Sequence, residues 1–239
     1  MIEDAIGHGR TWTAPVFNAQ HREQKLADPD VIENMWKFSR PITEEDAAGR
    51  YLRGRGITPP FSSVLRLHEA LWYFNDKGER TGSYPAIVAA IQAPSGEVVA
   101  LHRTYLQGIN PPTKLQEKLT KATIKNGFKG AAIRLHKPSD VLAVGEGIET
   151  ALSYAQLFNV PSWACMNTWG LENVEIPDQV RTVHIAIDND DAGRNAAQKL
   201  AIRLAKRQIQ VIQNPLPEWL RDRKGADWND VIRSSSNES

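Results

Sequence analysis

Apolar and polar positions in the second half of the chain follow the periods of alternating strands and helices. Strands are predicted at residues 141–144, 162–166, 182–187 and 209–212, and helices at residues 149–158 and 192–207. Such an order implies a mostly parallel sheet with right-handed crossovers, covered by helices on both faces.

The pattern between residues 64 and 106 is different, because short strands are separated there by turn signals. Strands are predicted at residues 64–67, 71–74, 86–92 and 98–105. Asn-Asp-Lys-Gly at residues 75–78 and Pro-Ser-Gly at residues 94–96 are typical of turns. We therefore expect a small antiparallel sheet in this region.

Two helices are predicted before this sheet. One begins near Asp30, and the other has Thr43 as its N-cap and ends at residues 53–56. After the sheet, residues 114–129 carry five lysines and are predicted to form a mobile loop and a short helix, which could close over a template or nucleotide.

These patterns divide the chain into four segments. They are an N-terminal arm or helix at residues 1–39, a basic α+β subdomain at residues 40–136, an α/β domain at residues 137–233 and a disordered tail at residues 234–239.

Two of the predicted strands in the second half end in acidic residues. Glu146 follows residues 141–144, and Asp188 and Asp190 follow residues 182–187. Ligands of parallel α/β sheets bind beyond the carboxyl ends of the strands, so these acids are predicted to converge on one cleft. Helix capping could explain Asp190 alone, but three acids at two strand ends are hard to explain in that way. Clustered carboxylates need a cation, and their oxygen atoms suit Mg²⁺ or Mn²⁺.

Other titratable residues have simpler explanations. Asp191 fits a helix cap, and Glu149 fits the first turn of a helix, where an acid stabilises the dipole. No paired ligand spacing links the histidines, so His102, His136 and His184 are predicted to be structural.

The cysteine count and the charge distribution narrow the possible classes of function. Cys165 is the single cysteine, which excludes a disulfide framework and a Cys-rich zinc site and suggests a reducing cytoplasm. No apolar run approaches the roughly 20 residues that span a bilayer, so no membrane partner is expected. Residues 40–136 hold 14 Lys and Arg against 8 Asp and Glu, although the net charge of the chain is +1. A basic region beside an acidic metal site suits an enzyme acting on nucleic acid, and a solvated basic surface is the open alternative.

Three motifs, in this order, resemble those of the Toprim domain. They are Gly-Glu-Gly at residues 145–147, Asp-x-Asp at residues 188–190 and Lys-Gly-Ala-Asp-Trp-Asn-Asp at residues 224–230. Toprim is the catalytic module shared by bacterial-type primases, topoisomerases of types IA and II and some nucleases. The resemblance is closest to primase-like Toprim proteins of phages, plasmids and integrated elements, and it extends over about residues 45–232.

The resemblance implies a fold and a site. The fold is a mostly parallel Toprim sheet flanked by helices, preceded by a smaller α+β domain with an antiparallel sheet. Glu146, Asp188 and Asp190 would be the catalytic residues and, together with Asp227, the metal ligands. Asp227 would have either a metal-binding or a structural role, and Asp230 is a weaker candidate.

Four residues of the middle region are predicted to bind nucleic acid or nucleotide. Arg103 and Tyr105 alternate on one face of a strand, where a cation and an aromatic ring suit a phosphate and a stacked base. A tyrosine packed at the sheet edge is the alternative. Lys129 belongs to the lysine-rich segment, and Arg134 lies in residues 130–135, which resemble part of the domain preceding Toprim in the primase-like group.

The function implied is metal-dependent nucleotidyl transfer, with RNA primers made from nucleoside triphosphates on single-stranded DNA during replication of a phage or mobile element. The sequence shows no zinc-binding segment and no helicase P-loop motif, so a separate helicase or zinc-binding module is the expected partner. Two alternatives stay open, because the same carboxylates would serve a Toprim nuclease and a non-catalytic DNA-binding accessory protein could keep them. A topoisomerase is disfavoured, since no gate-forming region fits into 239 residues.

Overall fold

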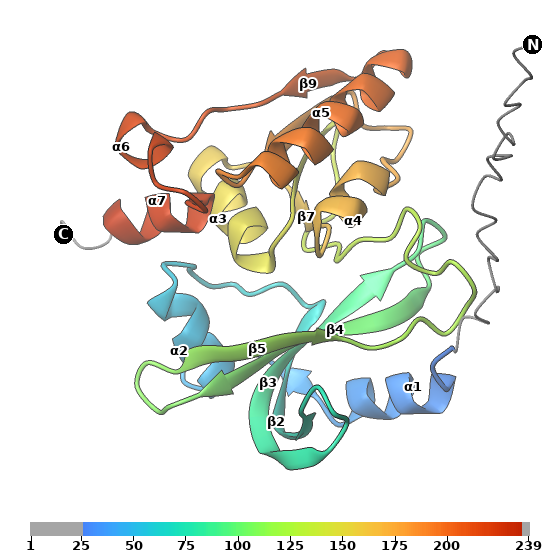
Figure 1. Ribbon diagram of the computed structural model, residues 1–239, viewed down its shortest axis with the longest axis vertical. Helices are drawn as coiled ribbons and strands as arrows, with labels where there is room; N and C mark the ends of the chain where they lie inside the picture. The colour runs from blue at the N-terminus through green and yellow to red at the C-terminus, as the bar shows by residue number, and fades with distance from the viewer. Residues whose placement is uncertain (1–25, 236–239) are drawn as a thin grey trace, which may run out of the picture.

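The computed structural model describes residues 26–235, which form two sheets stacked one above the other with helices around them (Figure 1). The first sheet is antiparallel and the second is parallel, which confirms the predicted α/β class and the order of its two parts. Within this range, no helix combines the length and apolar character that crossing a membrane requires.

The first sheet is an antiparallel meander of five strands in sequence order. The strands are β1 (Arg40–Pro41), β2 (Leu65–Phe74), β3 (Arg80–Gln92), β4 (Val98–Gln107) and β5 (Thr113–Leu119). Successive side chains of β3 point to opposite faces, as the strand period of two requires. Val88 packs in the cluster that includes Ile32 of helix α1 (Pro29–Lys37), whereas Ile87 packs with Leu52 of helix α2 (Ala47–Gly54).

Two predictions of secondary structure in this half are wrong. Residues 65–74 form one strand with a bulge between His68 and Leu71, not two separate strands. The first part of the lysine-rich segment 114–129 is strand β5, not a loop and short helix. Strand β5 pairs with β4 and lies at the edge of the sheet, where exposed charged side chains are tolerated and protect the unpaired edge.

The predicted cap of the second helix is also wrong. Asp46, not Thr43, is the N-cap of α2, and its Oδ1 accepts a hydrogen bond from the Gly49 nitrogen at 2.8 Å. The other carboxylate oxygen of Asp46 accepts from the Thr43 nitrogen at 2.7 Å. The carboxylate therefore closes a turn before the helix, and Thr43 lies outside it.

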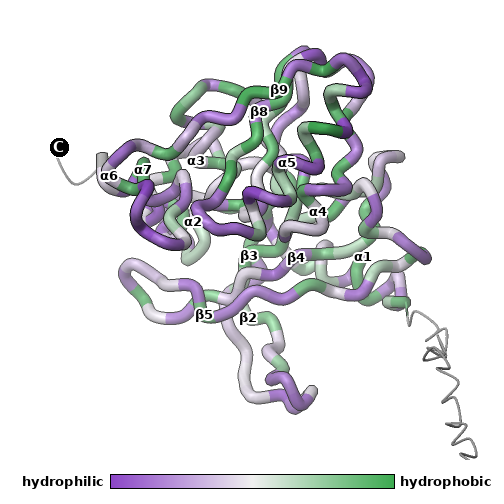
Figure 2. The backbone as a smooth tube through the Cα atoms, turned by 45° about the horizontal axis from the view of Figure 1, so that its top comes forward, coloured by the Kyte–Doolittle hydropathy of each residue, from purple (hydrophilic) through white to green (hydrophobic). Residues whose placement is uncertain are grey.

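The second sheet has four parallel strands in the order β7-β6-β8-β9. Its elements are β6 (Val141–Gly145), α3 (Ile148–Phe158), β7 (Ser162–Ala164), α4 (Thr168–Asn173), β8 (Thr182–Ala186), α5 (Asp191–Lys206), β9 (Gln210–Ile212), α6 (Glu218–Arg221) and α7 (Trp228–Ser235). One face packs Leu142 of β6 with Leu200 of α5, and the other packs Ala143 with Tyr154 of α3. Helices therefore cover both faces, as predicted, and Figure 2 shows apolar stretches through the β8 region and a more hydrophilic periphery.

The two halves share a continuous core and are joined by backbone pairing. Leu67 and Ile87 of the first sheet belong to the same buried cluster as Ile148 and Leu152 of α3. Ile133 pairs with Ala164 at the end of β7 through two backbone hydrogen bonds of 2.9 and 3.0 Å. The first sheet is thus fixed against the half that contains the parallel sheet.

The chain ends differ from the predicted segments. Of the predicted N-terminal arm, α1 lies among the described residues, and residues 1–25 lie outside them. Helix α7 continues to Ser235, so the predicted start of a disordered tail at residue 234 is wrong. The hydroxyl of Ser234 donates to the Asp230 carbonyl oxygen at 3.0 Å, one helical turn earlier. Residues 236–239 lie outside the described range.

Candidate active site

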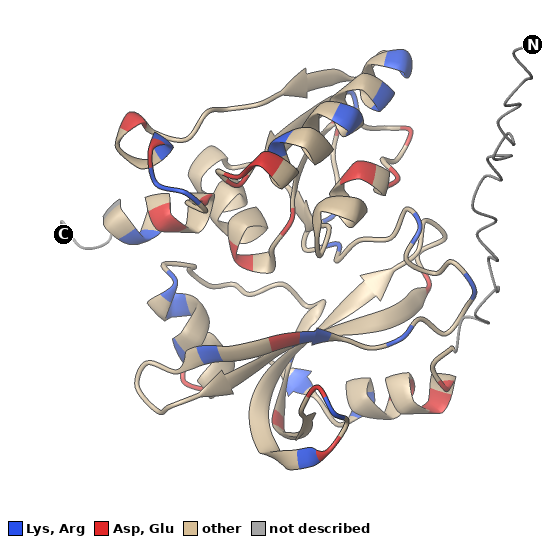
Figure 3. Ribbon diagram, viewed as in Figure 1, with Lys and Arg blue, Asp and Glu red and all other residues tan. Residues whose placement is uncertain are grey.

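Parallel strand ends bring the predicted acids to one edge of the second sheet. Gly145 at the end of β6 pairs in register with Ala186 at the end of β8. Glu146 follows the first strand directly, and Asp188 follows the second after one residue. In Figure 3, acidic segments lie at the start of α5 and in the first turn of α3, on the side of the second sheet that faces the first sheet.

Asp188 lies at the centre of this group of carboxylates. Burial raises its pKa to about 7, with further contributions from the charges of Asp227, Glu146 and Asp190 in that order. The Thr150 hydroxyl lies 3.4 Å from Asp188 Oδ1 and 3.3 Å from Asp227 Oδ2, so it can donate to either oxygen. The structure therefore brings together all four carboxylates predicted as metal ligands.

Asp227 reaches the group because its loop pairs with the loop after β8. The Asn189 nitrogen donates to the Ala226 carbonyl oxygen at 2.8 Å, and the Gly225 nitrogen donates to the Asn189 carbonyl oxygen at 3.0 Å. Asp227 Oδ1 also accepts from the Asp230 nitrogen at 3.0 Å, at the start of α7. One oxygen of Asp227 is thus used in the turn, and the other faces Thr150.

Glu146 is short of partners. Its Oε1 is buried and accepts no hydrogen bond from the described part of the chain. Burial, and then the charge of Asp190, raise the pKa of Glu146. A Cβ atom at Gly193 would lie 3.0 Å from Oε1 of Glu146 and 3.3 Å from Oδ1 of Asp190, so the glycine lets the first turn of α5 approach both acids.

The helix-capping predictions are only partly right. Asp190, not Asp191, is the N-cap of α5, and its Oδ1 accepts from the Gly193 nitrogen at 2.7 Å. Asp191 is a first-turn residue whose side chain is 93% exposed and pairs with Arg194 at 2.6 Å. Capping occupies one oxygen of Asp190, so this residue can still offer the other to a metal ion.

Glu149 is more than a first-turn helix residue. It is buried, and its Oε1 accepts from the Tyr51 hydroxyl at 2.5 Å and lies 2.8 Å from Lys114 Nζ of β5. Burial alone would raise its pKa, but the ammonium group and the hydroxyl together lower it to about 2. Lys114 also pairs with Glu117 at 2.5 Å. Sequence analysis missed this cluster because it placed Lys114 in a loop.

The donor set fits a divalent cation. No three or more His, Cys, Asp or Glu side chains among residues 26–235 are already arranged as a metal cage. Glu146, Asp188, Asp190 and Asp227 nevertheless offer only hard oxygen donors, and the groups that most raise the pKa of Asp188 after burial are the other three carboxylates. These four residues would hold the ion.

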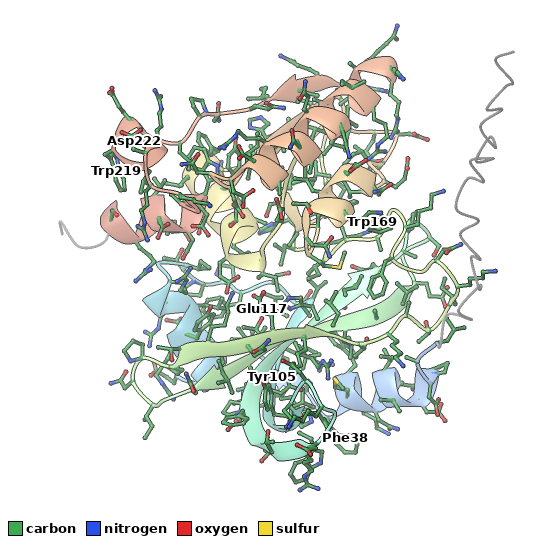
Figure 4. The ribbon with its side chains drawn as sticks, viewed as in Figure 1. Phe38, Tyr105, Glu117, Trp169, Trp219 and Asp222 are labelled. Carbon is green, nitrogen blue, oxygen red and sulfur yellow. The ribbon has the colours of Figure 1, made fainter. Side chains whose placement is uncertain are left out.

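The predicted nucleic-acid residues do not form one surface. The Tyr105 ring is completely buried and its hydroxyl donates to the Trp72 carbonyl oxygen at 2.8 Å, so the ring cannot stack on a base and the packing alternative applies. Arg103 lies on the same face and donates to the Leu119 carbonyl oxygen at 2.8 Å. Figure 4 shows Tyr105 on the opposite side of the first sheet from Glu117, which faces the half with the parallel sheet.

The other two basic residues differ from each other. Arg134 donates to the Ala93 carbonyl oxygen at 2.6 Å and stacks on Trp163 at 4.8 Å, which are structural contacts. Lys129 is exposed and lines a cavity between the two halves.

The three histidines predicted to be structural lie within the fold. His136 lies 3.3 Å from the Ser162 hydroxyl, and His184 lies 3.0 Å from the Tyr154 hydroxyl. His102 is buried, and burial lowers its pKa.

The sequence matches two family models. Residues 141–238 match the model described as a Toprim domain, and residues 27–135 match one described as a domain of unknown function, DUF7146. A search of curated proteins finds no match to the chain.

Solved structures of primase cores are similar to this fold. The primase fragment of the bacteriophage T7 primase-helicase protein has a TM-score of 0.53 at 15% identity, over 91% of this chain and 81% of that one. The DnaG catalytic core has a TM-score of 0.56 at 16% identity, over 87% and 77% of the two chains. The E. coli primase catalytic core has a TM-score of 0.54 at 17% identity, over 86% and 75%. At these identities the likeness establishes the fold.

Proposed function

We propose that this chain, whose residues 141–238 match the Toprim domain model and whose fold is similar to primase cores, is a divalent-metal-dependent nucleotidyltransferase that makes RNA primers on single-stranded DNA. The observation that carries this proposal is the convergence of four carboxylates at the carboxyl edge of the Toprim sheet, where the pKa of Asp188 is raised to about 7. Such a surplus of negative charge suits a bound cation.

The residues of the site would divide the work as follows. Asp188, Asp190 and Asp227, with or without Glu146, would hold one or two Mg²⁺ or Mn²⁺ ions. Bound ions of this kind neutralise a triphosphate and stabilise the attacking and leaving oxygens. Thr150, within hydrogen-bond distance of two of the aspartates, would orient them. Glu146 would be a further ligand or would accept the proton of the attacking 3′-hydroxyl, which bonds to the α-phosphorus as pyrophosphate leaves.

A cavity beside Asp188 supports nucleoside triphosphates as substrates. It has a volume of about 290 Å³, and Arg194 and Arg221 contribute to its wall. Guanidinium groups next to metal-binding acids suit the phosphates of a nucleotide.

The similar structures suggest a template and partners. The DnaG primase catalytic domain bound to ssDNA matches 87% of this chain with a TM-score of 0.52 at 16% identity. The Aquifex aeolicus primase structure contains zinc-binding and RNA polymerase domains, and the match covers 57% of that chain. We therefore propose single-stranded DNA as template, a separate zinc-binding module or helicase as partner, and a cytoplasmic role in replication of a phage or mobile element.

The direct test is incorporation of labelled ribonucleotides on single-stranded DNA with Mg²⁺ or Mn²⁺. Asp188→Asn and Asp190→Asn remove a ligand charge, and Asp191→Asn is the matched control, because that neighbouring aspartate is 93% exposed. Circular dichroism of each variant checks folding. Short products that disappear in the first two variants and persist in the third would support the primase.

Other results would select one of the alternatives. Template degradation that needs the same two aspartates, without synthesis, would identify a nuclease, because the same ions can direct water at a phosphodiester. Binding of single-stranded DNA without synthesis or degradation would identify an accessory protein that needs a partner for activity.

A further inference from the structure

A cavity between the two halves of the molecule is lined by aromatic and apolar side chains. Its volume is about 420 Å³, within the range of small-molecule sites. Leu119 and Phe128 come from the first half, and Met166 and Trp169 come from the second. Trp169 is 50% exposed, and Figure 4 shows it on the side of α4 that faces the first sheet. A large aromatic ring is therefore available to a ligand at this place.

The backbone around this cavity is unusual. Four described residues other than glycine have a positive φ, and two of them, Asn126 at 57° and Met166 at 71°, line the cavity. Asparagine tolerates this conformation better than most residues, but methionine does not. Left-handed backbone at a non-glycine residue costs of order 1 kcal/mol or more and is concentrated at functional sites.

The cavity lies at the end of the strand next to the one that precedes Glu146 of the candidate active site. Met166 follows Cys165, whose nitrogen donates to the Gly145 carbonyl oxygen at 2.8 Å, immediately before Glu146. Glu146 is also the charged neighbour that, after burial, raises the pKa of the Cys165 thiol. The cavity and Glu146 thus lie at the ends of the neighbouring strands β7 and β6.

We propose that this cavity, lined by Trp169, Phe128 and Met166, binds an unpaired nucleobase by stacking, next to the reacting phosphates. This inference rests on the proposed function and adds a subsite to it. The base could belong to the single-stranded template or to a free nucleotide, and its recognition is the same in both cases. Stacking on an aromatic ring is worth about 1–3 kcal/mol per base and tolerates any sequence, because every base has a π-face.

Lys129 would hold the phosphate attached to this base. It is exposed and lines the cavity, within the segment that also carries Lys121 and Lys125. The carboxylates of the active site would repel the same phosphate where no metal covers them. A cation on the far side of the base is therefore where the backbone of a nucleic acid can be bound.

The experiment compares two DNA probes on the full chain. The probes are dT12 and a 12-mer of equal charge made of abasic sites, and their dissociation constants are measured by fluorescence anisotropy. The wild-type protein should bind dT12 more tightly. Trp169→Ala should weaken binding of dT12 about tenfold and leave the abasic probe unchanged, so that the ratio of the two constants approaches one. Trp169→Phe should retain most of the ratio.

Two further variants separate stacking from charge and from general damage. Lys129→Ala should weaken binding of both probes equally and reduce the dependence of log K on log salt by about one. Trp219→Ala is the matched control, since this tryptophan of α6 is 58% exposed and lies away from Trp169 in Figure 4. It should change neither constant.

A titration with ATP in the absence of DNA distinguishes the two sources of the base. Weaker ATP binding in Trp169→Ala would assign the subsite to a free nucleotide, and an unchanged value together with the loss for dT12 would assign it to the template. The inference is overturned if Trp169→Ala keeps the wild-type ratio of the two dissociation constants and also binds ATP as tightly as the wild-type protein does. Priming by a variant that keeps the ratio would leave the proposed function standing without this subsite. A ratio that falls in a protein without priming activity would support the subsite and contradict the primase.

Discussion

Glu146 and Glu149 lie three residues apart, one just before and one within the first turn of α3, and their surroundings have opposite effects on them. The pKa of Glu146 is raised by burial and by Asp190. The pKa of Glu149 is lowered to about 2, because Lys114 and Tyr51 outweigh the effect of burial. Glu146 has a like charge beside it, and Glu149 has a cation from the opposite sheet.

This difference separates the candidate metal-binding cluster from a structural one. Lys114 and Glu149, called the balanced cluster below, neutralise each other across the junction of the two halves. This pair therefore needs no ligand and fixes the first sheet against α3. In the group of Glu146, Asp188, Asp190 and Asp227, called the unbalanced cluster below, the pKa values of Glu146 and Asp188 are raised by burial and by neighbouring carboxylates. A buried charge without compensation is costly, and natural sites retain it where a ligand completes them.

The largest expected effect is the loss of activity when a carboxylate of the unbalanced cluster is neutralised. Asp188→Asn or Asp190→Asn should reduce the rate of nucleotide incorporation roughly 100-fold or more, because a bound metal stabilises the transition state by several kcal/mol. Lys114→Met, measured in the same assay at a temperature below its own unfolding midpoint, should affect activity far less. Equal losses in all three variants would remove the distinction between the clusters.

The next largest effect is on stability, when the balanced cluster loses its cation. Lys114→Met should lower the free energy of unfolding by about 2 kcal/mol in urea, less than for a fully buried pair because Lys114 is partly exposed. Glu149 stabilises the wild-type fold above its unfolded pKa of about 4.5, and this contribution is lost as the pH falls towards 2. The variant should lack most of this acid dependence.

A double variant controls that experiment. Lys114→Met combined with Glu149→Gln removes the uncompensated charge, and Tyr51 can still donate to the amide oxygen. Recovery of at least half of the lost stability is expected. A double variant less stable than Lys114→Met would show that the pair acts through packing and not through charge.

The sequence predicted the unbalanced cluster because its signals are local. Glu146 and Asp188 come directly after apolar strands, and the direction of parallel strands places them at the same edge. Asp227 could be included only by its resemblance to a motif, since the loop pairing through Asn189 that brings it close is not visible in the sequence. The two sheets could likewise be predicted, because periods of two and of 3.6 residues are local patterns.

The balanced cluster, and the burial of the residues predicted to bind nucleic acid, depended on tertiary contacts that no local pattern encodes. Lys114 meets Glu149 only because β5 is an edge strand of the first sheet, and its lysines are equally typical of a loop. The alternation of Arg103 and Tyr105 placed both residues correctly on one face, but it could not show that this face is the one covered by α1. A period of two does not tell which side of a sheet faces solvent.

A smaller effect, of up to tenfold per pH unit, is expected in metal binding. Asp188 must lose its proton to bind a cation, and its pKa is raised to about 7. The dissociation constant for Mn²⁺, measured by calorimetry, should therefore increase as the pH falls from 7 to 6 and change little above pH 8. Asp188→Asn should bind more weakly and lose this dependence. A constant that is independent of pH between 6 and 8 in the wild-type protein would contradict the assigned cluster.

The smallest expected effect is a gain of stability in the metal-free protein. Because the pKa of Asp188 is higher in the folded chain, at about 7, than the usual value of 3.8, its favourable contribution exists below pH 3.8 and is lost as the pH rises through 7. At pH 8 its charge opposes folding, so Asp188→Asn should stabilise the metal-free protein by about 1 kcal/mol, or roughly 2–4 °C in Tm. Asp191→Asn should not, since that side chain is exposed and paired with Arg194. Adding Mg²⁺ should raise the Tm of the wild-type protein. The wild-type protein should then have a higher Tm than Asp188→Asn, the reverse of their order without metal. If Asp188→Asn is less stable than the wild-type protein without metal at pH 8, the cluster is already neutralised by the chain itself, and its surplus charge cannot be the reason that it binds a metal.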